Sequence, residues 1–296
     1  MKEKFIDKRF SSSSLLIIEK AEEIIDYYES RGFSLSLRQL YYQFVARDII
    51  PNTEKSYKRI GSIVNDARLS GLIDWRMIDD RTRKLKRLSC WDSPQDIMKT
   101  AAMQYRTDKW TGSNTYIEIW VEKDALSEIV GKASDVYEIP YFPCRGYVSQ
   151  SAMYDAAKRF ENRLEYETNL YLLYLGDHDP SGIDMTRDIS NRFEIFGVPE
   201  IYIKRIALNM DQIHEQNPPP NPAKITDSRY RNYVSEYGNK SWELDSLNPD
   251  YLYDLIISEI ENIVDVEEFE NKKEEQEIAK KKMFKMIDNF DYFEED

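Results

Sequence analysis

The stretch NLYLLYLGDHDPSG, residues 169–182, decides how this chain is organised. Its first part, residues 169–176, is an almost unbroken apolar run, which is typical of a strand buried on both faces of a parallel sheet. The run ends in a polar turn that contains Asp177 and Asp179, and Pro180 stiffens this turn. Residues 181–193 then have helical spacing, so the stretch predicts a strand, a turn and a helix in succession.

The same alternation continues on both sides of this stretch. Strand-like runs rich in β-branched and aromatic residues occupy 115–121 (TYIEIWV), 138–144 (EIPYFPC) and 200–208 (EIYIKRIAL). Helical spacing fills the intervals at about 124–133 and 149–164. Strands that alternate with helices predict an α/β domain with a mainly parallel sheet.

Carboxylates follow two of the predicted strands directly. Glu122 follows the strand 115–121, while Asp177 and Asp179 follow the strand that ends at 176. Ligands of open α/β sheets bind beyond the carboxyl ends of the strands, and carboxylates gathered there repel one another unless a cation lies among them. Hard oxygen ligands without a His/Cys cluster favour Mg²⁺, with Mn²⁺ as a substitute, over zinc. A lone D-x-D more often caps a helix, so the prediction depends on the joint placement of all three acids. A single histidine in a polar turn, here His178, is predicted to be solvated.

The N-terminal region has a different pattern. Helical spacing is present at 13–31, 37–47 and 54–70, and LIDWRMIDD (72–80) predicts a short strand or wing. Three helices followed by a short strand in a basic segment suggest a winged helix-turn-helix domain. A generic small helical domain is the alternative.

Charge is unevenly distributed along the chain, whose net charge is −13. Residues 254–296 hold 15 acidic and 6 basic side chains, whereas residues 38–87 hold 12 basic and 6 acidic ones. A basic segment is suited to DNA phosphates, although a charge run is often only a solvated face. Lys58, Arg59 and Arg68 are the candidate DNA contacts within it.

The remaining segments complete a four-part division of the chain. We predict a DNA-binding domain at 1–95, a connector at 96–114, an α/β domain at 115–248 and an acidic helical extension at 249–296. Further features are a helix at 94–106, a rigid Pro-rich loop at 217–224, and helices at 249–263 and 265–288, the last an exposed helix or a dimer arm.

Several protein classes are disfavoured by composition. The hydrophobic fraction of 41% is enough for folded cores, and no apolar run approaches the roughly 18 residues of a membrane span. Cys90 and Cys144 are the only cysteines, which excludes a disulfide framework and a cysteine-based zinc cluster. The N-terminal MKEKFIDKRFSSSS has no apolar signal-peptide core, so we expect a soluble cytoplasmic protein without a membrane partner.

Several motifs together resemble a known family. The matching segments are WVEKDAL (120–126), CRGYVSQSA (144–152) and GDHDPSGIDM (176–185). They resemble the successive Toprim motifs of the topoisomerase VI A subunit and of the meiotic double-strand-break transesterase. RQLYY (38–42) is similar to the R-x-x-Y-Y motif of the winged-helix domain in that family, and YGNKSWELDSL (237–247) to its E-L-x-x-L element. The motif order agrees, and the resemblance covers about residues 15–210, although CRGYVSQSA is the looser match.

The resemblance implies roles for particular residues. Tyr42 would attack the DNA backbone and form a phosphotyrosine link, while Arg38 would contact the scissile phosphate. Glu122, Asp177 and Asp179 would hold Mg²⁺. Tyr41, Lys123 and Arg145 would be further DNA contacts. The family also implies a homodimer with DNA in a groove across it, and strand passage would need a separate ATPase subunit, because the chain has no ATPase segment.

Three functions remain open from the sequence. The first is tyrosyl transesterification of DNA. The second is a Toprim nuclease that uses water, because Tyr41 and Tyr42 lie in a helix whose apolar face could bury one of them. The third is a non-enzymatic winged-helix DNA-binding protein.

Overall fold

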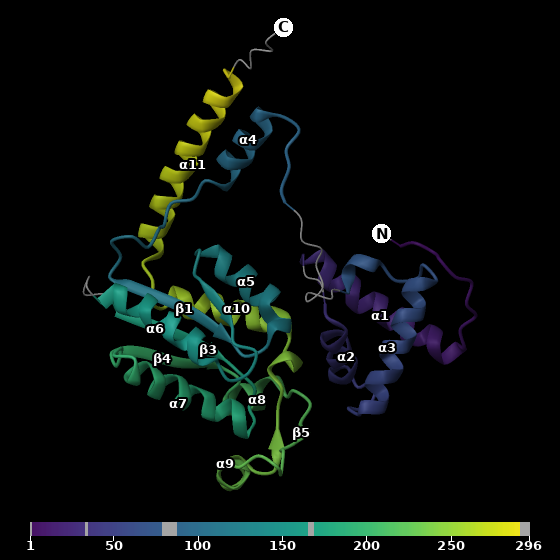
Figure 1. Cartoon of the computed structure of the whole chain (residues 1–296). Coiled ribbons are helices and arrows are strands. Elements are labelled where there is room, and N and C mark those ends of the chain that lie inside the picture. The colour runs from purple at the N-terminus through teal and green to yellow at the C-terminus, as the bar shows by residue number, and fades with distance from the viewer. Residues whose placement is uncertain (1, 33–34, 79–87, 165–168, 291–296) are drawn as a thin grey trace.

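The computed structural model describes residues 2–32, 35–78, 88–164 and 169–290 (Figure 1). Within these ranges the central element is a four-stranded sheet in the order β2-β1-β3-β4. Its strands are β1 (Thr115–Val121), β2 (Tyr141–Pro143), β3 (Asn169–Leu175) and β4 (Ile201–Ala207). All neighbouring pairs are parallel, which confirms the predicted α/β class and its mainly parallel sheet.

Helices cover both faces of this sheet. Helices α6 (Gln150–Leu164) and α7 (Pro180–Ile195) lie on one face, and α5 (Ser127–Val136) and α10 (Pro249–Glu261) lie on the other (Figure 1). Side chains alternate along each strand, so Leu172 belongs to the cluster under α6 and α7 while its neighbour Leu173 belongs to the cluster of the opposite face. Both are fully buried, which explains the nearly continuous apolar run of β3.

The N-terminal region forms a helical unit beside the sheet domain (Figure 1). Its helices are α1 (Ser12–Ser30), α2 (Leu37–Ala46) and α3 (Glu54–Leu69). A serine or threonine precedes each helix, and its side chain accepts a hydrogen bond from a backbone N–H of the first turn. Ser36 also forms a full capping box with Gln39. The predicted helix positions are therefore confirmed within two residues.

The predicted strand or wing at 72–80 is wrong over the residues that are described. Trp75–Met77 forms a short 3₁₀ helix, because the Asp74 carboxylate accepts from the backbone N–H of Arg76 at 2.8 Å and closes a turn. Only Ile78 pairs with another segment, in an isolated bridge to Leu35. Residues 79–80 of the predicted wing, and the basic residues among 81–87, lie outside the described residues. The fold thus supports a small helical unit without confirming a winged helix.

The remaining elements are small or lie outside the sheet domain. Helices α4 (Pro94–Gln104) and α11 (Val266–Asp288) extend away from the rest of the molecule (Figure 1). The Pro-rich loop contains a two-residue strand, β5 (Asn221–Pro222), paired with β6 (Lys240–Ser241), which the sequence did not predict. Helices α8 (Met210–Gln216) and α9 (Tyr230–Tyr237) and the 3₁₀ turn Leu244–Ser246 were also not predicted. No helix in the described part of the chain is both long and apolar enough to cross a membrane.

Candidate functional site

The carboxyl ends of β1 and β3 bring the predicted acids to one edge of the sheet. Val121 lies opposite Leu175 in the parallel register, so Glu122 and Asp177 follow at nearly the same level. One oxygen of Glu122 accepts from the backbone N–H of Asp177 at 2.9 Å. Asp179 begins α7, and its Oδ1 accepts from Gly182 N–H at 2.6 Å. A side chain at Gly182 would lie 2.2 Å from the Asp177 carbonyl oxygen, so only glycine allows this close turn.

Asp177 is linked to a partly buried lysine. Its Oδ2 lies 3.1 Å from Lys123 Nζ, and its Oδ1 accepts from the backbone N–H of Leu244 at 2.8 Å. The same ammonium lies 3.0 Å from both Glu243 Oε2 and Asp245 Oδ1. Burial disfavours the charge on Lys123, but these three carboxylates outweigh it and raise its pKa above the ordinary value. Lys123 therefore neutralises part of an acidic cluster and is not displayed toward solvent.

Two of the three acids, Glu122 and Asp177, have raised pKa values. Burial raises the pKa of Glu122 to about 7, and the charges of Asp177 and Asp179 add to this effect. Burial also raises the pKa of Asp177 to about 6, against the opposing influence of Lys123. Asp177 and Asp179 are thus close enough to Glu122 to influence its ionisation.

A partly buried arginine that sequence reasoning missed supports the turn 176–182. The guanidinium of Arg205, from β4, donates to the carbonyl oxygens of Gly176, Asp177 and Gly182 at 2.6–2.8 Å. It also lies over the ring of Tyr174 at 5.6 Å. The available signal was the pair of cationic residues, Lys204 and Arg205, inside the predicted strand 200–208.

The RQLYY segment in α2 faces this edge of the sheet. Arg38 Nη2 lies 2.7 Å from Glu243 Oε2, and its Nε lies 3.6 Å from Asp245 Oδ2. The guanidinium carbon of Arg38 lies 6.0 Å from the centroid of the Tyr42 ring, and the charge of Glu243 bears on the phenol. Tyr42 is only 3% exposed, and burial, together with the charge of Glu243, raises its pKa well above that of a free tyrosine. In this conformation the phenol is held protonated.

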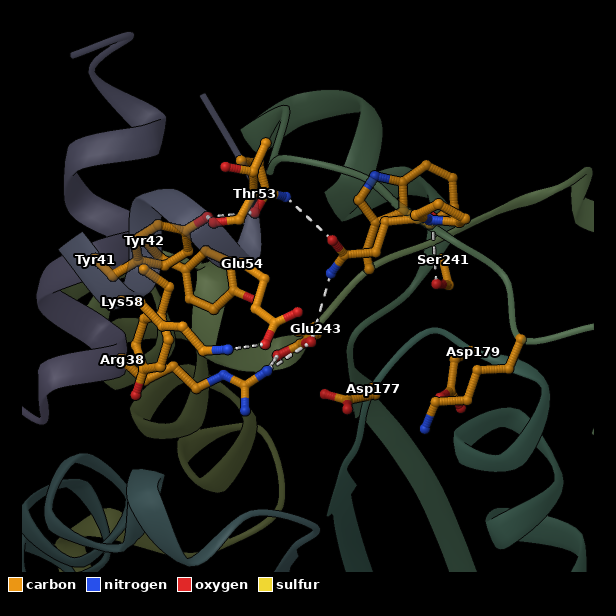
Figure 2. A pocket seen from close by; sticks show the side chains of 16 residues that line it. Arg38, Tyr41, Tyr42, Thr53, Glu54, Lys58, Asp177, Asp179, Ser241 and Glu243 are labelled. Atoms are coloured by element: carbon orange, nitrogen blue, oxygen red, sulfur yellow. Dashed lines mark hydrogen bonds and ion pairs between the residues drawn. The ribbon is translucent and has the colours of Figure 1, made fainter. Parts of the chain in front are cut away.

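A cavity of about 490 Å³ lies between α2, α3, the β5–β6 pair and the sheet edge. Figure 2 shows Arg38 directed at Glu243, with Asp177 and Asp179 on the far side of the cavity from the two tyrosines. The predicted residues that line it are Arg38, Tyr41, Tyr42, Lys58, Asp177 and Asp179. Glu243, Asn221 and Lys224 are lining residues that the sequence reasoning did not select, although Glu243 is the glutamate of the E-L-x-x-L element.

Other predicted DNA contacts lie elsewhere or are already engaged. Arg59 and Arg145 do not line the cavity; Arg145 is exposed and lies 3.2 Å from Asp124. Arg68 stacks on Trp75 at 4.5 Å and donates to its carbonyl oxygen, so it braces the end of α3. Lys58 lines the cavity and pairs with Glu54 at 2.6 Å. Arg38 and Lys58 are therefore the predicted cations that reach the cavity from the helical unit.

The prediction that His178 is solvated is wrong. The side chain is buried, and its Nδ1 lies 2.8 Å from the hydroxyl of Tyr233. Rings of Tyr237 and Trp242 also contact the imidazole edge-on. Burial lowers the pKa of His178 to about 4, so the ring is neutral and structural. The unpredicted helix α9 supplies two of these aromatic rings, which is why the turn alone did not indicate burial.

The donor set is compatible with Mg²⁺, although the acids are otherwise engaged in this conformation. Among the described residues, no three His, Cys, Asp or Glu side chains are grouped as a metal site. Glu122 is turned to a backbone N–H, Asp177 to Lys123, and Asp179 to the start of α7. All three offer hard oxygen atoms, and a cation among them would relieve the repulsion by Asp177 and Asp179 that adds to the effect of burial on the pKa of Glu122. Metal binding would require Asp177 and Asp179 to exchange their present partners.

Comparisons of the chain with protein-family models, with curated proteins and with solved structures gave no match. Function is therefore argued from the site.

Proposed function

We propose that this chain cleaves the DNA backbone in the cavity between α2 and the sheet edge, with Tyr42 as the nucleophile. The observation that supports this most strongly is the meeting of two sequence motifs that lie far apart in the chain. The tyrosine and arginine of RQLYY line the same cavity as Asp177 and Asp179. A phenol, a guanidinium and carboxylates are the groups that phosphoryl transfer to a tyrosine requires.

The chain's own residues divide the chemistry as follows. The Tyr42 oxygen would attack phosphorus, form a Tyr–O–P bond and displace the 3′ oxygen of the neighbouring nucleotide. The carboxylate of Glu243, whose charge bears on the phenol, would take the proton, and the leaving oxygen would regain a proton from solvent. Arg38 would pair with the phosphate. Mg²⁺ bound by Glu122, Asp177 and Asp179 would stabilise charge on the phosphate oxygens.

DNA binding must then change the contacts of the resting site. Arg38 is held by Glu243, and an incoming phosphate would compete with that carboxylate for the guanidinium. Lys123 is within 3.1 Å of Asp177, which leaves that acid engaged until a cation or phosphate draws one of the two away. The resting geometry is therefore that of a protected site.

A second candidate function is hydrolysis of DNA by a metal-activated water. The burial of Tyr42 at 3% exposure favours it, because a nucleophile must reach the phosphorus atom. In that case Tyr42 would only pack and position Arg38. The homodimer and a separate ATPase subunit remain predictions under either mechanism.

One assay separates these functions. Supercoiled plasmid is incubated with the protein and Mg²⁺ or Mn²⁺, stopped with detergent, and analysed with and without protease. Transesterification predicts cut DNA that migrates normally only after protease, lost in Tyr42→Phe and in Asp177→Ala. Tyr41→Phe is the matched control, because its hydroxyl donates to Asn52 at 2.8 Å and not to Glu243. Protein-free cut DNA that survives in Tyr42→Phe would establish hydrolysis. Binding without cleavage in either metal would support the non-enzymatic alternative and contradict the proposal.

A further inference from the structure

Helices α4 and α11 form an antiparallel two-helix arm that extends from the sheet domain (Figure 1). At the tip, Gln95 Nε2 donates to the carbonyl oxygen of Phe290 at 2.9 Å. At the base, the backbone N–H of Thr107 donates to Gln276 Oε1 at 2.9 Å. The start of α4 therefore lies beside the end of α11.

The base of the arm is firmly anchored. Phe269 is buried and stacks on Trp110 at 5.4 Å between ring centroids. The buried ammonium of Lys109 donates to Gln276 at 2.7 Å and to Glu138 at 2.9 Å. These contacts set the direction of α11, so the arm is presented as a fixed projection and not as a loose tail.

One face of α11 leaves apolar side chains in solvent. Ile278 is 47% exposed and Met286 is 73% exposed, and Lys282 lies between them at four-residue spacing. Residues four apart share one helix face, and this face is turned away from the buried side chains of Gln276 and Ile287. Two paired helices bury a single seam, whereas four helices enclose a core, so a second pair of helices would cover this face.

The order of charges along α11 indicates which molecule would cover this face. Residues 266–277 carry six acidic and two basic side chains, whereas residues 278–288 carry four basic and one acidic. A second α11 packed antiparallel would place its basic half against the acidic half of the first. In a two-fold symmetric contact between antiparallel helices, the acidic half of each copy faces the basic half of the other, and α11 has this charge pattern.

We propose that the arm is a dimerisation element in which α11 of a second copy of this chain packs antiparallel on the face that contains Ile278. With the two-fold axis beside Ile278, Glu275 of each copy lies opposite Lys282 of the other. Both side chains are exposed, and they are two turns apart within their own helix, beyond the spacing at which helix pairs interact. The proposal is independent of the proposed DNA chemistry.

The test is a charge-swap series measured by sedimentation equilibrium of the full chain. The wild type is expected to be a dimer that weakens as salt is raised. Glu275→Lys and Lys282→Glu should each raise the dimer Kd by about tenfold or more, because two attractive pairs become repulsive. The double variant E275K/K282E should regain most of the wild-type affinity, and an equimolar mixture of the two single variants should form heterodimers.

Two controls keep the result interpretable. Lys158→Glu makes the same charge change on α6, away from the arm, and should leave the dimer Kd unchanged. Circular dichroism of every variant checks that the helices are intact. A monomeric wild type would overturn the proposal, as would a dimer indifferent to both single swaps, or single-swap losses that neither the double variant nor the mixture repairs.

Discussion

His178 has a buried and neutral ring, with its Nδ1 beside the Tyr233 hydroxyl. That hydroxyl has two carbonyl acceptors, so it accepts the hydrogen bond that Nδ1–H donates. The pKa of the folded group is lowered to about 4 by burial, below the ordinary value of 6.5. Between these values the unfolded chain binds a proton that the folded chain does not, so this contribution to stability is lost as pH falls from 6.5 toward 4.

We predict that His178→Asn flattens the dependence of unfolding free energy on pH between about 6.5 and 4, relative to the wild type. The amide nitrogen of asparagine replaces Nδ1–H without a titrating ring. Urea unfolding at a series of pH values measures the difference between the two proteins, in which the contributions of the raised carboxyl groups largely cancel. His214, the other histidine of the chain, is exposed, and His214→Asn serves as the control. Parallel pH profiles for wild type and His178→Asn would contradict the prediction.

At the scale of elements, the turn between β3 and α7 depends on a side chain of β4. Arg205 donates to three carbonyl oxygens of residues 176–182, and of these the carbonyl of Gly176 also accepts from the backbone N–H of Leu208 at 2.9 Å. Arg205→Met keeps the apolar stem but removes the guanidinium donors from these buried carbonyl oxygens. We expect a loss of about 2–5 kcal/mol in unfolding free energy, measured by urea titration.

A surface arginine provides the comparison for that loss. Arg187 on α7 pairs with Asp184 at 2.8 Å and has a largely exposed side chain. Arg187→Met should cost about 1 kcal/mol or less, because exposed ion pairs contribute little. Equal losses in Arg187→Met and Arg205→Met would show that the buried carbonyl contacts do not hold the turn.

The loop after β1 contributes the cation of the acidic cluster. Lys123 is within 3.1 Å of Asp177, Glu243 and Asp245, so Lys123→Met removes the cation that all three acids share. We predict a Tm below that of the wild type, and a larger rise of Tm on adding Mg²⁺ than the wild type shows, because a bound cation stabilises the folded state by mass action. Differential scanning fluorimetry with Mg²⁺ and with an equal ionic strength of NaCl measures this. A Tm of Lys123→Met that responds equally to both salts would argue against cation binding in the cluster.

At the scale of the whole molecule, local patterns predicted the sheet because its central strands, β1 and β3, are largely buried. Residues 170–175 are all leucine or tyrosine on both faces of the sheet, and the strand is followed by the glycine and acids that form the turn. The placement of Glu122 beside Asp177 followed from the general rule for parallel strands. No local sequence pattern indicated the contacts between distant segments. Arg38 and Glu243 are 205 positions apart, and their ion pair depends on how the helical unit seats against the sheet domain.

The burial of Tyr42 illustrates the same limit. From helical spacing alone, Tyr42 could belong either to the core or to the site. In the structure it lies at the boundary of both: it lines the cavity and is only 3% exposed. The short elements were not predicted, for a different reason. The turn Leu244–Ser246 and helix α9 are too short for hydrophobic periodicity, yet they supply the N–H that binds Asp177 and the rings around His178.

The seating of the helical unit on the sheet domain rests partly on a single acid. Asp250 at the start of α10 accepts from Tyr27 at 2.8 Å and lies 2.6 Å from Arg31 Nε, both in or beside α1. Asp250→Asn removes the charge that holds this side of the contact. We expect hydrogen exchange of the amides of α2 to become about fivefold faster, as a loss of roughly 1 kcal/mol in the closed arrangement would produce.

Exchange measured by mass spectrometry distinguishes local opening from general destabilisation. Amides of β3, in the centre of the sheet domain, should keep their wild-type rates, because Asp250 acts at the contact and not in that core. Asp254→Asn makes the same substitution one turn later on α10, where the side chain is exposed, and should change neither region. Faster exchange in α2 alone would mean that the helical unit can separate from the sheet edge, which is the movement that would expose Tyr42 to a phosphate. Equal acceleration in α2 and β3, or none in either, would refute the role of Asp250 as the hold on that movement.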